Sequence, residues 1–69
     1  MNNKKYAEFI ESYAQFCKKA GIGEYNGIYG FVRHEVKGDL KAKGKDKYEI
    51  DIFAETVAKD ICKRLKIKY

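Results

Sequence analysis

Few side chains in this sequence are of the types that perform covalent chemistry. There is one histidine, His34, and there are two cysteines, Cys17 and Cys62. Nucleophilic catalysis needs a nucleophile, a base within reach and a group that stabilises the developing charge, and no such set stands out. If the segment around His34 is helical, its imidazole points away from the apolar stripe, which favours a surface histidine over a catalytic base. We therefore predict that the protein is not an enzyme.

The same residues give no pattern of a metal or nucleotide site. Two cysteines and one histidine fall one ligand short of a closed tetrahedral zinc site. Each cysteine lies on an apolar helical stripe, so buried thiols are the main prediction; a redox role remains a minor alternative if the terminal helices pack antiparallel. The glycines of residues 21–27 lack the spacing of a dinucleotide-binding fingerprint and the Gly-Lys-Ser/Thr ending of a phosphate-binding loop. We predict no cofactor and no metal.

Basic side chains are the most prominent chemical feature of the chain. The net charge is +5, and residues 37–69 contain ten Lys or Arg against six Asp or Glu. One cluster surrounds Gly44 and a second lies near the C-terminal end, a pattern that favours polyanions or an acidic protein surface. The residues predicted to contact nucleic acid are Arg33, Lys41, Lys43, Lys45, Lys47, Lys63, Arg64 and Lys66.

Residues 3–20 are predicted to form a helix, because apolar side chains recur at steps of three and four. Asn2 or Asn3 is the expected cap at its start. Gly21 is placed for a left-handed stop, with Ile22 supplying the hydrophobic contact that often follows.

Residues 25–37 allow two interpretations. A helix is favoured by an apolar stripe and by the Lys37-Gly38 ending, while a strand would place Ile28, Val32 and Val36 on one face. In residues 39–52, apolar side chains alternate with polar ones on either side of Gly44, as in a short β-hairpin. A plain charged loop is the alternative.

The last helix is predicted from Asp51, as its cap, to Lys66. The expected fold is therefore mainly α, with a small α+β fold as the variant: a single domain, 1–69, of three helices with a short basic β-hairpin or loop before the last helix. In layout alone, such a hairpin resembles the wing of a winged-helix DNA-binding domain. The predicted core comprises Tyr6, Phe9, Ile10, Tyr13, Phe16, Cys17, Ile28, Val32, Val36, Phe53, Val57, Ile61 and Leu65.

The first functional hypothesis is a small basic nucleic-acid-binding accessory or regulatory protein. The lysines of the hairpin and of the last helix would contact the phosphate backbone. Base recognition, if any, would come from Asn26, Arg33 or His34.

The alternative hypothesis is a protein-binding inhibitor or adaptor, such as a phage-encoded anti-defence protein. Its basic clusters would meet an acidic protein surface, and aromatic residues outside the stripes, such as Phe31 and Tyr69, would anchor the interface. The absence of a signal-peptide pattern and of a long apolar run predicts a cytoplasmic protein with no membrane partner. A chain this short has a thin stability margin, and self-association as a homodimer is one remedy.

Overall fold

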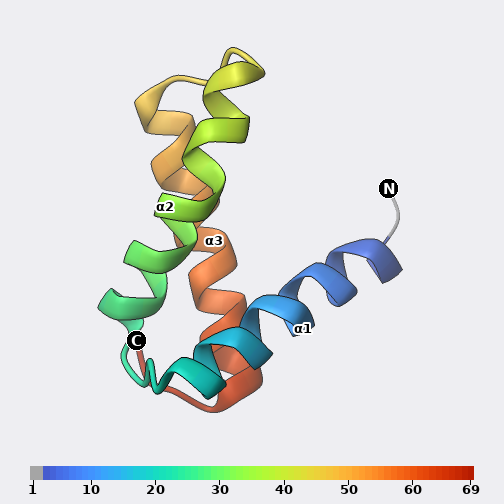
Figure 1. The fold of residues 1–69 in the computed structure, drawn as a ribbon, viewed down its shortest axis with the longest axis vertical. Coiled ribbons are helices and arrows are strands. Elements are labelled where there is room, and N and C mark those ends of the chain that lie inside the picture. Colours follow the sequence, from blue (N-terminus) through green and yellow to red (C-terminus); the bar gives the residue numbers. More distant parts are fainter. Residues whose placement is uncertain (1–2) are drawn as a thin grey trace.

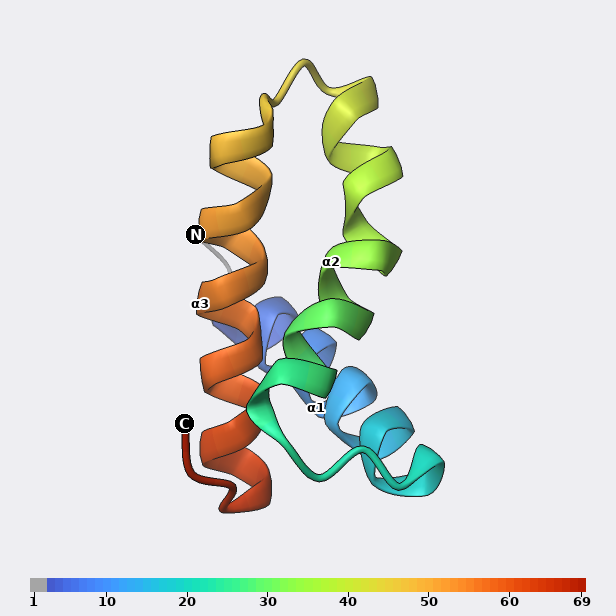
Figure 2. The same ribbon diagram turned by 90° about the vertical axis from the view of Figure 1, so that its left-hand side faces the viewer.

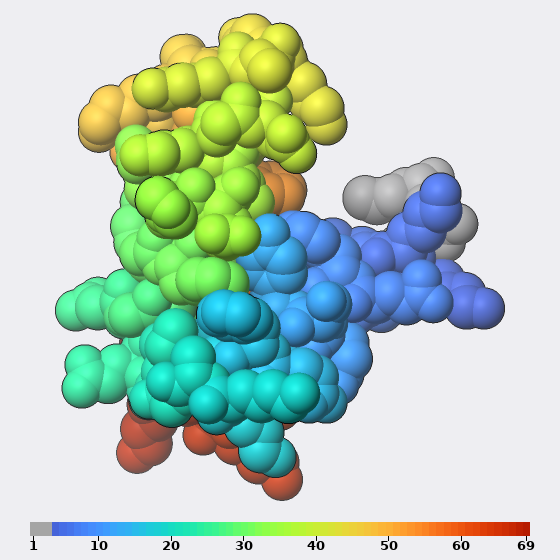
Figure 3. Space-filling view, viewed as in Figure 1, coloured from blue at the N-terminus to red at the C-terminus, as the bar shows by residue number. Residues whose placement is uncertain are grey.

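The described part of the chain forms three helices, α1 (Asn3–Ala20), α2 (Tyr25–Ala42) and α3 (Lys47–Leu65) (Figure 1). The computed structural model describes residues 3–69, and it contains no strand within that range. Helices α2 and α3 lie side by side and antiparallel, while α1 crosses the half of α3 nearest the C-terminus (Figures 1 and 2). The N-terminal half of α1 extends away from the α2–α3 pair, and a notch separates the two in the space-filling view (Figure 3). The prediction of a mainly α fold is confirmed.

The core lies where α1 crosses the α2–α3 pair. Fully buried isoleucines and valines come from α2 and α3, and alanines on α1 and α3 allow the helices to approach closely. Burying one such Ile or Val side chain contributes roughly 1.5–3 kcal/mol, so a few residues supply most of the stability of a small domain. The buried cluster comprises Ile10, Ala14, Cys17, Ile28, Val32, Val36, Ala54, Val57, Ala58, Ile61 and Cys62.

The end of α1 follows the sequence-based prediction. Gly21 adopts a left-handed conformation with φ of 73°. The Ile22 amide donates to the Cys17 carbonyl at 2.9 Å, and the Ile22 side chain packs against the core. The predicted cap Asn2 lies outside the described residues.

Residues 25–37 are helical, so the strand alternative was wrong, and α2 continues beyond Gly38 to Ala42. The predicted ending at Gly38 came too early, because Leu40 extends the apolar stripe by one more turn and packs against the core. The helix ends at Ala42, and Gly44, two residues beyond, adopts a left-handed conformation with φ of 83°. The Lys45 amide then donates to the Leu40 carbonyl at 2.9 Å, which is the helix-ending pattern expected for such a glycine.

Neither strand of the predicted β-hairpin is present among residues 3–69. Residues 39–42 belong to α2, residues 47–52 belong to α3, and residues 43–46 form the connecting loop. Helix α3 therefore begins four residues earlier than Asp51, the predicted cap, and Lys66 follows it as a left-handed cap with φ of 60°.

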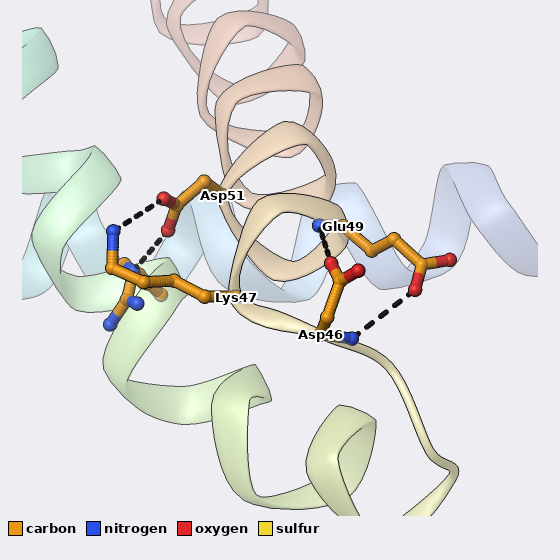
Figure 4. A network of polar contacts seen from close by, with 5 residues as sticks. Asp46, Lys47, Glu49 and Asp51 are labelled. Carbon is orange, nitrogen blue, oxygen red and sulfur yellow. Dashed lines mark hydrogen bonds and ion pairs between the residues drawn. The ribbon is translucent and has the colours of Figure 1, made fainter.

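A capping box explains why α3 begins at Lys47. The Asp46 carboxylate accepts a hydrogen bond from the Glu49 amide at 2.8 Å, and the Glu49 carboxylate accepts one from the Asp46 amide at 3.2 Å (Figure 4). Two amides that the first helical turn leaves unpaired are thereby satisfied, which fixes the start of the helix.

Two aromatic residues of the predicted core are exposed. Phe16 is 54% and Phe53 is 36% exposed. Phe16 stacks on Phe31 with ring centroids 4.7 Å apart, at the edge of the core. Phe31 is therefore half-buried in an aromatic contact, although the sequence predicted it as part of a binding patch.

Candidate protein-docking groove

The structure places seven of the eight predicted basic residues at two opposite ends of the α2–α3 pair, whereas Arg33 lies in the middle of α2. Lys41, Lys43, Lys45 and Lys47 lie at and around the loop between α2 and α3. The second group, Lys63, Arg64 and Lys66, lies at the other end of α3. At 1.5 Å per residue, roughly 24 Å of helix separates Lys47 from Lys63, against a screening length of about 8 Å at physiological ionic strength. The two groups therefore do not form one continuous surface.

Several of these residues are also paired with carboxylates. Arg33 Nε donates to Asp51 Oδ1 at 2.6 Å, and the Lys47 ammonium lies 3.2 Å from the other carboxylate oxygen (Figure 4). The hydrogen bond from Arg33 is the main reason why the pKa of Asp51 is lowered, and it raises the pKa of Arg33 in turn. Lys45 lies 3.7 Å from Glu49. The α3 carboxylates thus offset much of the positive charge near the start of that helix.

At the other end of α3, Arg64 donates to Glu11 of α1 at 2.6 Å. A hydrogen bond from Gln15, and then the bond from Arg64, lowers the pKa of Glu11. Lys41, Lys43, Lys63 and Lys66 make no ion pair within the described residues. Half of the predicted nucleic-acid contacts are therefore unpaired, and they are divided between the two ends.

An exposed apolar groove lies along the first turns of α3. Tyr48 is 73% and Ile52 is 48% exposed, and Phe53 lies beside them. The groove has a volume of about 420 Å³ and is open to solvent. Its lining residues are Leu40, Lys45, Tyr48, Glu49, Ile52, Phe53 and Thr56.

The groove exists because α3 is apolar on two faces in its first half. Tyr48 and Ile50 are two residues apart, which places them roughly 200° apart around the helix. Ile50 is buried, so Tyr48 and Ile52 must face outward. Helix α1 crosses the other half of α3 and does not cover this face (Figure 1). The ring of Phe53 lies 6.5 Å from that of Phe9, where the groove meets α1.

In the half of α1 that leaves the α2–α3 pair, the side chain of Tyr6 is hydrogen-bonded to α3. The Tyr6 hydroxyl donates to Asp60 Oδ2 at 2.5 Å. Burial, and then this bond, raises the pKa of Tyr6 to about 12.

Of the side chains that could perform covalent chemistry, Cys17 and Cys62 both lie in the buried cluster, and His34 does not. His34 is exposed on α2, and no group of three potential metal ligands occurs in the part of the chain that the structure describes. Both cysteines are fully buried, and burial raises the pKa of each thiol, so neither is poised as a nucleophile. Over residues 3–69, none of the helices combines the length and apolar character needed to cross a membrane.

Sequence reasoning missed the groove because it began the last helix at Asp51. The pattern Asp46-x-x-Glu49 was a signal for the true start. With the helix extended to Lys47, Tyr48 and Ile52 fall opposite the buried stripe.

No protein-family model, curated protein sequence or solved structure matches this chain.

Proposed function

We propose that the protein is a non-enzymatic protein-binding module, an adaptor or inhibitor, and that it docks its partner in the α3 groove. One observation supports this above all others: Tyr48, Ile52 and Phe53 hold large apolar side chains in solvent along one open groove. Exposed apolar side chains gathered in one groove, with charged residues at its rim, are typical of protein interaction sites.

Aromatic residues suit this role. Tyr and Phe present large, rigid apolar areas, and interfaces are enriched in them at the positions that contribute most to binding. Tyr48 exposes its ring at the end of the groove that lies near the loop, and Ile52 lies one turn further along α3. These two side chains are the expected anchors of the interface.

Two half-exposed apolar residues offer a matched experiment. Ile52 is in the groove and is 48% exposed, whereas Phe16 lies on α1 outside it and is 54% exposed. Tagged wild-type protein, Ile52→Ala and Phe16→Ala would each be used to capture partners from the producing cells. We expect Ile52→Ala to lose a partner roughly fivefold or more, as truncation of a binding anchor does, and Phe16→Ala to retain it. Thermal unfolding followed by circular dichroism confirms that both variants are folded.

Equal capture of the same partner by both variants would contradict the proposal. Loss of the partner in Phe16→Ala alone would also contradict it, because the interface would then lie on α1.

Phosphate-backbone binding is a second candidate, supported by the unpaired Lys41 and Lys43 at the loop end. It has less support than protein binding, because the remaining predicted contacts are paired or lie at the far end of α3. A gel shift at two salt concentrations tests it: steep loss of affinity with salt, and uniform weakening in Lys41→Gln/Lys43→Gln, are the expected signs.

A further inference from the structure

We propose that a pocket between the ends of α1 and α3 binds a small phosphorylated molecule by its phosphate group. The pocket has a volume of about 400 Å³, which falls in the usual range for small-molecule sites. The turn after α1 and the last turn of α3 meet at the same end of the molecule, away from the docking groove (Figure 2). The pocket is lined by Lys18, Gly21, Ile22, Gly23, Arg64, Leu65, Lys66 and Ile67.

Three cationic side chains from two helix ends line this pocket, and no carboxylate of the described residues does. Lys18 comes from the last turn of α1, Arg64 from the last turn of α3, and Lys66 directly follows α3. Within residues 3–69, Lys18 and Lys66 form no ion pair. Arg64 donates to Glu11 through one Nη, and a guanidinium has five N–H donors, so donors remain for an anion. A phosphate group with nearly two negative charges suits these three partners.

The charge around the pocket is positive even when every nearby carboxylate is counted. Residues 11–24 and 60–69, which meet here, contain six Lys or Arg against three Asp or Glu, and the carboxylate at the end of the chain leaves a surplus of two positive charges. The ends of α1 and α3 add negative potential through their dipoles, which three cations at contact distance outweigh. The docking groove, by contrast, is lined by one cation, Lys45, and one carboxylate, Glu49.

The backbone of Lys66 adds an independent argument. Its φ of 60° is left-handed, and among residues 3–69 no other residue except glycine has a positive φ. After α1 and α2, the chain uses Gly21 and Gly44 for this conformation, which a side chain disfavours. The turn itself needs only the backbone, which lets the Ile67 amide donate to the Cys62 carbonyl at 2.8 Å. Glycine would make this turn without strain, so a strained lysine in the lining of a pocket indicates a role for its side chain.

The floor of the pocket favours a small molecule over a nucleic acid. Ile22, Leu65 and Ile67 form this floor, and each is half-buried because it also packs against the core. At Gly21 and Gly23 even an added Cβ would meet open space, so the entrance is unobstructed. A nucleic-acid backbone would place phosphates along the surface and leave this floor uncovered. A molecule with a phosphate at one end and an apolar part or ring at the other would contact both the cations and the floor.

Two probes test the inference, phenyl phosphate and inorganic phosphate. Each would be titrated at low salt into ¹⁵N-labelled protein while amide shifts are followed by NMR. We expect both to shift amides of residues 18–23 and 64–67. Phenyl phosphate should bind roughly fivefold more tightly, because its ring buries apolar surface on the floor.

The variant Lys66→Gly separates a binding role from a structural one. It removes the ammonium group but relieves the left-handed strain, so the Tm should not fall, whereas the affinity for phenyl phosphate should decrease roughly three- to fivefold. Lys18→Gln should weaken binding to a similar extent. Lys43→Gln is the matched control: it removes one unpaired charge beyond the end of α2 and should leave the affinity unchanged.

Several results would overturn the inference: no shifts with either probe, shifts outside residues 18–23 and 64–67, equal affinity of the two probes, or unchanged affinity in Lys66→Gly. An equal loss in Lys43→Gln would also overturn it, because attraction by net charge alone would then suffice. Shifts at these amides with duplex DNA or with phosphatidic acid vesicles, but with neither probe, would assign the surface to nucleic acid or to a lipid headgroup. Ile52→Ala should leave phosphate binding unchanged, so failure here would not affect the proposed docking groove.

Discussion

The capping box holds the first turn of α3, which carries the groove residue Tyr48, so its removal should affect the stability of that turn. Asp46→Ala would delete the acceptor of the Glu49 amide, which lies 2.8 Å from the Asp46 carboxylate. Loss of such a cap costs about 1 kcal/mol. For a chain of 69 residues, that free energy corresponds to a decrease in Tm of roughly 7 °C.

A second variant separates the expected decrease in Tm into the contributions of the hydrogen bond and of the negative charge. Asp46→Asn keeps an oxygen that can accept the same hydrogen bond but removes the negative charge beside the positive end of the helix dipole. We expect Asp46→Asn to lower the Tm by less than half as much as Asp46→Ala. Thermal unfolding at neutral pH, followed by circular dichroism at the helical band, measures both.

The reasoning would be refuted if Asp46→Ala melted within about 1 °C of the wild type. That result would mean that α3 begins further along the chain than Lys47, as the sequence pattern first indicated. Tyr48 would then lie outside the helix, and the groove would lose its first turn.

Three further outcomes are expected. Gly38→Ala should raise stability by up to about 1 kcal/mol, because the site is helical with open space around it. Gly44→Ala should lower stability, because φ there is 83°. Urea unfolding of the two variants measures both changes. The pKa of Tyr6 is raised to about 12, so its phenol binds the proton more tightly in the folded state, and its contribution to stability should be complete below pH 10 and lost between pH 10 and 12. In an ultraviolet titration, Tyr6→Phe should show one fewer phenol ionising near pH 12 than the wild type. Identical titration curves would contradict this. Cys17 and Cys62 should react with a thiol reagent only after unfolding, because both are buried with a raised pKa, and rapid labelling of the native protein would contradict the packing of the core.

Local signals predicted the first helix well. The apolar stripe of residues 3–20, the left-handed Gly21 and the contact of Ile22 all depend on neighbours within a few positions in the chain, so the sequence contains them directly. The helical interpretation of residues 25–37 was confirmed for the same reason.

The predicted β-hairpin was wrong because two helix ends can produce an alternating pattern. Leu40 ends the stripe of α2, while Tyr48, Ile50 and Ile52 line two faces of α3, so their spacing of two residues reflects opposite sides of one helix. The capping signal Asp46-x-x-Glu49, or knowledge of what packs against Ile50, distinguishes this arrangement from a strand.

The groove itself depends on how α1 crosses α3, which sequence periodicity does not specify. A stripe identifies which side of a helix is apolar but not how much of its length another helix covers. Phe53 was predicted to be buried on that basis, yet it is 36% exposed. Likewise, both basic groups fall in the second half of the sequence, but the structure places them at opposite ends of the α2–α3 pair.

Site-specific photo-crosslinking would test the docking groove most directly. A photoreactive phenylalanine analogue would replace Ile52 in one variant and Phe16 in another, and both would be irradiated in the producing cells. The proposal requires a discrete protein adduct from position 52 that unlabelled wild-type protein competes away, and no such adduct from position 16. The same adduct from both positions, or an adduct from position 16 alone, would contradict it.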